Sequence, residues 1–254
     1  AACMLGCSLM LIIAAMRLQK SIVSKVFIYT FMFVLLLGML LTKSRSGLLS
    51  LMGTIVLMGV FGRSKKVAWL VIIAAITISM TFGGFREAFL RRIQRTSSIK
   101  EDTSVVGRFQ TWSNYFKTAT AKTYLVGQGV SRARELTSSE SHSSYVSLIT
   151  VYGIGGVIWA AIALIIFFRR ALVLRNFPDP LISAVSAGCM WALITWGIYS
   201  ATADALNSVY SRYLLFYLVI LIDRAYNIAR QQQGLLLYDG EVEDMEMQYA
   251  GAES

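Results

Sequence analysis

Hydrophobic residues along this chain form long continuous blocks and do not alternate with polar residues. Seven blocks stand out, at about residues 1–16, 26–42, 47–61, 67–83, 144–168, 181–200 and 208–222. An α-helix needs about 17–25 apolar residues to cross ~30 Å of hydrocarbon, and most blocks approach that length. Only helices and closed barrels pair every backbone polar group within lipid, and continuous apolar runs favour helices. The pattern predicts an all-α protein, a polytopic transmembrane helical bundle.

The order of the blocks divides the chain into four regions. Residues 1–83 and 143–222 are predicted to be transmembrane helices, and residues 84–142 a loop with amphipathic helices on the outer side. Residues 223–254 are a predicted cytoplasmic acidic tail, whose glutamines and carboxylates are typical of a disordered segment or of a solvated end without a role. The first block is already under way at Ala1, with no n-region before it, so we expect spans upstream of it to be missing.

The charge of the loops gives the expected orientation. The chain is 56% hydrophobic, its mean hydropathy is +0.60, and its net charge is +10. Loops on the cytoplasmic side of a membrane are rich in Lys and Arg. Basic clusters at 17–25, 63–66, 169–175 and 224–230 all fall inside if the seven spans alternate in direction. The turn at 43–47, the loop at 84–142 and the segment at 200–209 then face outside.

The outer loop is basic although it lies on the side where the charge rule expects few cations. Residues 84–142 hold ten Lys and Arg against five Asp and Glu. Long loops cross a membrane regardless of charge, so the orientation stands. A basic surface beside lipid attracts anionic partners, and the phosphate groups of a lipid carrier are the obvious candidates.

Two amphipathic helices are predicted within this loop. Phe85, Phe89 and Ile93 recur every fourth residue among arginines, which is typical of a helix lying in the headgroup plane; simple anchoring to anionic lipid also explains it. A second helix begins near Thr103 or Ser104, either of which can cap it. Its apolar stripe consists of Phe109, Trp112, Phe116 and Ala119.

Three polar residues on the outer side are candidates for chemistry. Arg108 lies one turn before Trp112, and an ordered guanidinium suits a pair of phosphate oxygens; a structural cation–π contact is the alternative. His142 is the single histidine and borders the fifth block. It can take a proton from a hydroxyl near pH 7, or merely cap a helix. Arg45, in the outer turn, either binds substrate or reaches toward headgroups.

Other kinds of site have little support in the sequence. Cys3, Cys7 and Cys189 all lie in apolar blocks and are best interpreted as small buried hydrophobic residues, although Cys3 and Cys7, one turn apart, allow a metal pair. Zinc-type spacing, a phosphate-binding glycine loop and a G-x-S-x-G motif are all missing. No metal or cofactor is expected, and nucleic acid is not an expected partner because the basic groups face out of the cell.

Several short motifs occur in an order that resembles a known family. They are Thr42-Lys43-Ser44-Arg45-Ser46-Gly47, Gly107-Arg108-Phe109-Gln110-Thr111-Trp112, Gly127-Gln128-Gly129, His142-Ser143-Ser144-Tyr145 and Tyr152-Gly153-Ile154-Gly155-Gly156. This order is similar to that of the O-antigen ligases and O-antigen polymerases, and the similarity covers residues 30–170. Ser143 stands where the family often has Asn, and members usually have ten or more spans.

The resemblance implies a multi-pass glycosyltransferase of the bacterial inner membrane with its site on the periplasmic side. Such enzymes transfer glycans from undecaprenyl diphosphate to a hydroxyl acceptor and need neither nucleotide nor metal. Arg45 and Arg108 then match essential arginines and His142 the essential histidine. Arg132, Arg134 and Trp112 are expected to bind substrate, with the two arginines at the rim of the site. Whether the acceptor makes the enzyme a ligase or a polymerase stays open.

Two other classes of function remain as alternatives. A lipid-linked glycan flippase or other transporter normally has ionisable groups within its spans, whereas here charge is concentrated in one loop. A non-enzymatic assembly subunit is the second alternative. If the enzyme interpretation holds, Arg45, Arg108 and His142 must converge at one cleft open to the outside and to lipid.

Overall fold

The computed structural model describes residues 2–42, 44–61, 110, 112–117, 119–129, 143–203, 205 and 208–252. Within these ranges it describes the backbone alone, without side chains, at residues 17, 40, 45, 202 and 234–252. Within these ranges all regular structure is helical and there is no strand. The helices are α1 (Ala2–Ala15), a 3-10 turn (Met16–Leu18), α2 (Ile22–Leu41), α3 (Arg45–Phe61), α7 (Ala121–Val126), α9 (Ser144–Leu174), α10 (Pro180–Thr202) and α11 (Val209–Ala252).

Among the described residues, three helices are long and apolar enough to cross a membrane. They lie at 22–39 in α2, 144–174 in α9 and 180–201 in α10, with mean hydropathies of 2.1, 2.3 and 1.7. Helices α1 and α3 are apolar but shorter. Length and composition therefore support a membrane-embedded protein. The predicted block at 67–83 lies outside the described residues, and each of the other blocks coincides with a helix.

Helix α10 is the centre of the packing, because α1, α3, α9 and α11 all lie against it. Its side chains Cys189, Met190 and Trp196 belong to the main hydrophobic core. Small residues bring α1 close to it: a Cβ added at Gly188 would lie 3.0 Å from the Ala14 Cβ, and one added at Gly6 would lie 3.2 Å from Thr195 Cγ2. Close approach over small residues is the usual way that helices pack within lipid. Residue 6 opposite 195 and residue 14 opposite 188 make α1 and α10 antiparallel.

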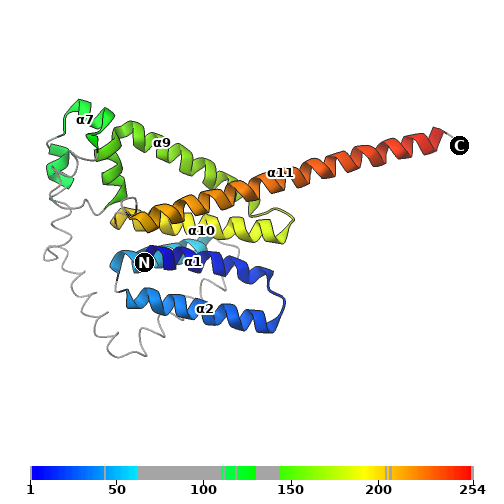
Figure 1. The fold of residues 1–254 in the computed structure, drawn as a ribbon, viewed down its shortest axis with the longest axis horizontal. Coiled ribbons are helices and arrows are strands. Elements are labelled where there is room, and N and C mark those ends of the chain that lie inside the picture. The colour runs from blue at the N-terminus through cyan, green and yellow to red at the C-terminus, as the bar shows by residue number, and fades with distance from the viewer. Residues whose placement is uncertain are drawn as a thin grey trace.

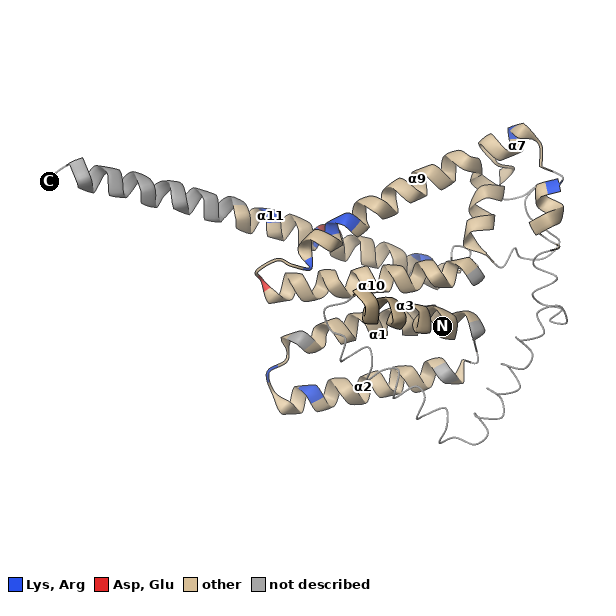
Figure 2. Cartoon of the chain, turned by 180° about the vertical axis from the view of Figure 1, so that it is seen from behind, with Lys and Arg blue, Asp and Glu red and all other residues tan. Residues whose placement is uncertain are grey.

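The helix ends gather into two groups, which we call the α7 end and the opposite end of the bundle formed by α1, α2, α3, α9, α10 and α11. Figure 1 shows the α2–α3 turn, α7 and the starts of α9 and α11 at the α7 end. The α1–α2 and α9–α10 turns lie at the opposite end. In Figure 2 the charged segments lie toward these ends, whereas the lengths between them are tan. The basic clusters 17–25 and 169–175 thus fall on one side, as the predicted orientation requires.

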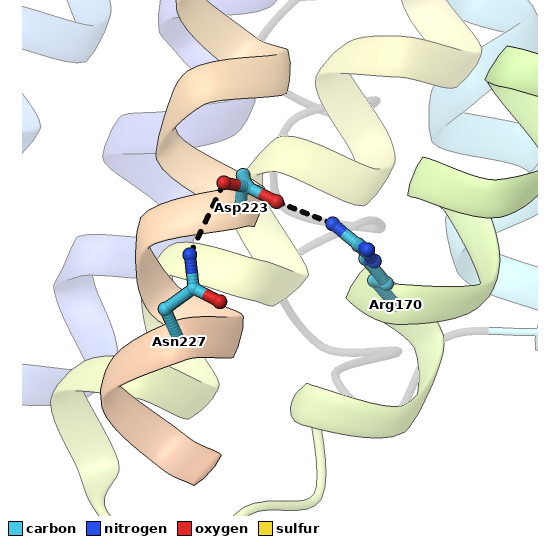
Figure 3. Close-up of polar contacts among 3 residues, drawn as sticks. All are labelled: Arg170, Asp223 and Asn227. Atoms are coloured by element: carbon cyan, nitrogen blue, oxygen red, sulfur yellow. Dashed lines mark hydrogen bonds and ion pairs between the residues drawn. The ribbon is translucent and has the colours of Figure 1, made fainter. Parts of the chain in front are cut away.

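Polar contacts organise the opposite end. The Asp179 carboxylate accepts hydrogen bonds from the backbone N–H groups of Leu181 and Ile182 and so caps α10. These bonds favour the charged carboxylate and lower its pKa. Arg170 on α9 pairs with Asp223 on α11, as Figure 3 shows, and Asn227 Nδ2 donates to the same carboxylate at 3.2 Å.

Two sequence predictions differ from the structure. The tail after Arg230 was expected to be disordered, but α11 continues to Ala252 and runs past the other helices (Figure 1). The segment contains no proline and many Gln, Glu, Leu and Met, all of which propagate helices well. In the outer loop, residues 112–117 are helical as predicted. However, Phe116 of the predicted apolar stripe is exposed, and its neighbour Tyr115 is buried instead.

Candidate functional site at the α7 end of the bundle

The start of α3 is fixed by a serine and a glycine. The Ser44 Oγ accepts a hydrogen bond from the backbone N–H of Gly47 at 3.2 Å, which satisfies one of the free donors of the first helical turn. A Cβ at Gly47 would lie 2.6 Å from the Ala2 Cβ, so only glycine lets α3 begin this close to α1. Arg45 is the first residue of α3, and its side chain is outside the description.

Buried hydroxyls join α3 to α10. The Thr54 hydroxyl donates to the carbonyl oxygen of Ser50 at 2.8 Å. The Thr195 hydroxyl lies 3.0 Å from the Thr54 hydroxyl and 2.9 Å from the carbonyl oxygen of Trp191. Interhelical hydrogen bonds of this kind stabilise helix pairs within lipid and fix their relative position.

The start of α9 is attached to the end of α10 by two further side-chain hydrogen bonds. Ser144 Oγ donates to the carbonyl oxygen of Ala203 at 3.3 Å, and the Tyr145 hydroxyl donates to that of Gly197 at 2.9 Å. Ala203 is the C-cap residue of α10, and Gly197 lies in its last turns. Ser143 and Ser144 are buried at this junction. The Thr54–Thr195 contact fixes α3 along α10, and Figure 1 shows the starts of α3 and α9 at the same end of the bundle.

A close crossing of two backbones attaches α7 to α9. Helix α9 is interrupted at Gly153, whose φ of 67° and ψ of −169° lie outside the helical region. A Cβ there would lie 2.5 Å from the carbonyl oxygen of Leu125, and a Cβ at Gly127 (φ 79°) would lie 2.3 Å from that of Val151. Between them, the Gln128 N–H donates to the carbonyl oxygen of Thr150 at 2.9 Å. Both glycines are required, because a side chain on either would enter the other backbone.

Several buried polar atoms have no hydrogen-bond partner in the described part of the chain. Trp196 Nε1 and Ser200 Oγ, one helical turn apart on α10, are two of them, and Gln128 Oε1 beside the crossing is a third. Most buried polar groups in proteins are paired, so such atoms call for an explanation. Trp196 and Ser200 thus provide two donors toward the end of α10, and Gln128 provides an amide oxygen beside the crossing.

The predicted site residues are only partly described. Arg108, Arg132, Arg134 and His142 lie outside the described residues, so their predicted convergence with Arg45 stays a prediction. Trp112 lies in the helical stretch 112–117 and is half-buried. The predicted amphipathic helix around 85–95 also lies outside the description. What the structure adds is that Arg45 and Ser143, which directly follows His142, belong to helix starts at the same end of the bundle.

Sequence reasoning missed the packing partners at this end. The signal that could have indicated the backbone crossing is the presence of two glycine-rich motifs, Gly127-Gln128-Gly129 and the segment 152–156. No periodic pattern in the sequence predicts the contact between Thr54 and Thr195. In the described part of the chain, no group of His, Cys, Asp and Glu side chains could hold a metal ion.

The comparisons with known proteins add no relatives. No protein-family model matches the chain, and no curated protein matches it. The similarity to O-antigen ligases and polymerases therefore rests on the order of the motifs given above.

Proposed function

We propose that this chain is a polytopic membrane glycosyltransferase of the O-antigen ligase or polymerase type. It transfers a glycan from an undecaprenyl-diphosphate carrier to a hydroxyl acceptor on the outer face of a bacterial inner membrane, with inversion and without a metal. The observation that carries the proposal is that α3 and α9 both start at the α7 end of the bundle, with the start of α9 bonded to the last turns of α10. It supports a shared site for Arg45 and His142, whose positions are 97 apart in the sequence.

In the proposed reaction, His142 removes the proton of the acceptor hydroxyl as a general base. The hydroxyl oxygen then attacks the anomeric carbon of the donor glycan. A new C–O bond forms while the bond from that carbon to the diphosphate oxygen breaks, and undecaprenyl diphosphate leaves with the bonding electron pair. Arg45 and Arg108 stabilise the negative charge that develops on the leaving group. Arg132, Arg134 and Trp112 bind substrate, with the two arginines at the rim.

The proposal requires the α7 end to face the periplasm. Support comes from the basic clusters 17–25 and 169–175, which belong to turns at the opposite end, where the positive-inside rule expects the cytoplasm. Labelling of single cysteines at Ser64 and Ser138 in intact cells tests the orientation. We expect a membrane-impermeant thiol reagent to label position 138 and not position 64. The reverse pattern would refute the proposed site.

The reaction itself is tested with the full-length protein in proteoliposomes that contain a lipid-linked glycan and a hydroxyl acceptor. The substitution His142→Ala should remove most transfer, because general-base catalysis contributes on the order of 100- to 10,000-fold. Lys20→Ala, at the opposite end, is the matched control and should transfer at the normal rate. Undiminished transfer by His142→Ala would exclude this histidine as the base.

Two alternatives are distinguished by the same preparation. A flippase or other transporter would move lipid-linked glycan across the bilayer without forming product. A non-enzymatic assembly subunit would leave transfer unchanged when Arg108 is replaced by Ala. Product formed by the purified protein and lost on Arg108→Ala excludes both alternatives. The chemical identity of the accepted hydroxyl then separates a ligase from a polymerase.

A further inference from the structure

Several large apolar side chains are exposed where α7 meets the kink of α9, and we call them the α7 patch. It consists of Phe116, Leu125, Val126, Tyr152 and Ile154. Leu125 and Val126 are 64% and 69% exposed, an unusual state for branched aliphatic side chains side by side on a short helix. Contiguous exposed apolar surface of this kind marks an interaction site.

The α7 patch is continuous with the apolar surface of α9. The carbonyl oxygen of Leu125 lies 2.5 Å from a Cβ built at Gly153 and 3.9 Å from one built at Gly155, so α7 rests on the kink. Beyond the kink, Ile158, Trp159 and Ile162 are also exposed, and only 6% of the apolar window of α9 is buried. A surface this apolar over this length is suited to hydrocarbon.

The length of α9 locates the patch relative to the membrane. Between Gly153 and Arg169, which belongs to the basic cluster at the opposite end, α9 rises about 22 Å at ~1.5 Å per residue. The hydrocarbon layer of a bilayer is ~30 Å thick. With Arg169 at the inner edge of that layer, the kink at Gly153 and the α7 helix that rests on it lie about 8 Å inside its outer edge, a depth of ~5–10 Å being typical of interfacial helices.

The charge beside the patch favours anionic lipid. Lys117 and Lys122 are exposed on the same short segment. The sequence from 103 to 134 contains no Asp or Glu, so no carboxylate of that stretch competes for these ammonium groups. Lysines held at a membrane surface are attracted to anionic phospholipids. Apolar side chains next to lysines at this depth are what an interfacial helix presents to a bilayer.

We propose that α7, docked on the Gly153 kink, is a membrane-interface element that binds anionic phospholipid. Leu125 and Val126 enter the boundary between acyl chains and headgroups, and Lys117 and Lys122 contact lipid phosphates. The element holds the outer segment against the bilayer at the α7 end of the bundle. This inference depends on the membrane-embedded fold and not on glycan transfer.

The test uses an environment-sensitive fluorophore on Val126→Cys in the full chain, reconstituted in nanodiscs of phosphatidylcholine and phosphatidylglycerol. The three native cysteines are buried, so the introduced thiol is the one that reacts. We expect blue-shifted emission that loses intensity when the lipids carry bromine near the glycerol end of the acyl chains. Gln233→Cys, at an exposed site on α11, is the control and should keep water-like, bromine-insensitive emission.

The lysines are tested in the same labelled background. Lys117→Gln together with Lys122→Gln should reduce the blue shift and the bromine quenching in nanodiscs with phosphatidylglycerol, and should change little in pure phosphatidylcholine. Water-like emission at position 126 in both lipids would overturn the proposal. Blue-shifted emission without bromine quenching would also overturn it, because a protein surface, such as a second copy of the chain, would then cover the patch. An equal effect of the lysine substitutions in both lipids would refute the binding of anionic lipid.

Discussion

Replacing Gly153 by alanine should detach α7 from α9. An alanine at φ 67° and ψ −169° occupies a region that is accessible almost only to glycine, which costs on the order of 1–3 kcal/mol. Its Cβ would lie 2.5 Å from the carbonyl oxygen of Leu125 and 2.6 Å from the nitrogen of Gly127, so the two backbones must separate. Overpacking of this kind adds about 1–3 kcal/mol. The crossing should therefore lose about 2–6 kcal/mol.

The loss of stability at the crossing cannot exceed the free energy with which α7 docks on α9, since α7 can detach without unfolding the bundle. The appropriate assay is hydrogen–deuterium exchange at the Gln128 amide, which donates to the carbonyl oxygen of Thr150 at 2.9 Å. About 2 kcal/mol corresponds to a loss of protection of ~30-fold, at ten-fold per 1.4 kcal/mol. We expect at least this loss at Gln128, with exchange in α10 unchanged.

Two other glycines separate the effect of the backbone angle from the effect of the added methyl group. Gly129 has a φ of 73°, and a Cβ there would meet nothing within 4 Å, so Gly129→Ala tests the backbone angle alone. Gly155 is an ordinary helical residue whose added Cβ would stay 3.9 Å from the Leu125 oxygen, so Gly155→Ala tests an extra methyl group on the same helix. Native protection of Gln128 in Gly153→Ala, or an equal loss in Gly155→Ala, would refute the steric argument.

Three further predictions concern the bundle. Thr195→Val should destabilise the protein by about 0.6 kcal/mol, the usual value of an interhelical hydrogen bond in lipid. Thr30→Val is the control and should leave helix packing unchanged, because the Thr30 hydroxyl donates to the Val26 carbonyl oxygen within α2. Reversible unfolding in mixed micelles measures both variants. The double-mutant cycle of Arg170→Gln and Asp223→Asn should give a coupling free energy of about 0.2–1 kcal/mol. This coupling should weaken as the salt concentration rises, since both groups are partly exposed. A coupling free energy of zero at low salt would contradict the pairing. The pKa of Asp179 is lowered below its ordinary value of 3.8. The stabilising effect of the carboxylate is therefore complete above that pH and is lost as the pH falls through the lower pKa of the folded protein. Asp179→Asn keeps a capping side chain and should remove that part of the acid sensitivity, as measured by unfolding between neutral and acid pH.

The helices could be predicted from the sequence because lipid imposes a simple rule on apolar length. The choice of helix partners could not, since every apolar surface is equally well accommodated by hydrocarbon. The pairs Gly6–Thr195 and Thr54–Thr195 are decided by small side chains and hydroxyls that leave hydropathy unchanged. Gly153 likewise leaves the hydropathy of its block unchanged, so the block at 144–168 is continuous in the sequence although α9 is broken at this residue.

Less of the candidate site than of the helices could be predicted from the sequence. The turn at 43–47 before α3 followed from its position between two apolar blocks. The Ser44 cap and the close approach of Gly47 to Ala2 became visible only in the structure. The common end of the α3 and α9 starts followed from counting spans. The crossing of Gly127 and Gly153 needed the tertiary structure, since neither glycine has a local requirement that points to the other. The convergence of Arg45, Arg108 and His142 stays a prediction.

The central position of α10 has a consequence for biosynthesis. Cys7 contributes a contact to the Ala192 carbonyl oxygen that spans 185 residues of sequence. Helices α1, α2 and α3 leave the ribosome well before the helix that they pack against, at a synthesis rate of about 5–20 residues per second. If the fold is polytopic as we propose, they remain in the bilayer for roughly ten seconds or more as separately inserted helices, which lipid tolerates because each satisfies its own backbone. On that fold, assembly of the bundle is a late event, and truncation before residue 180 would leave the early helices without their common packing partner.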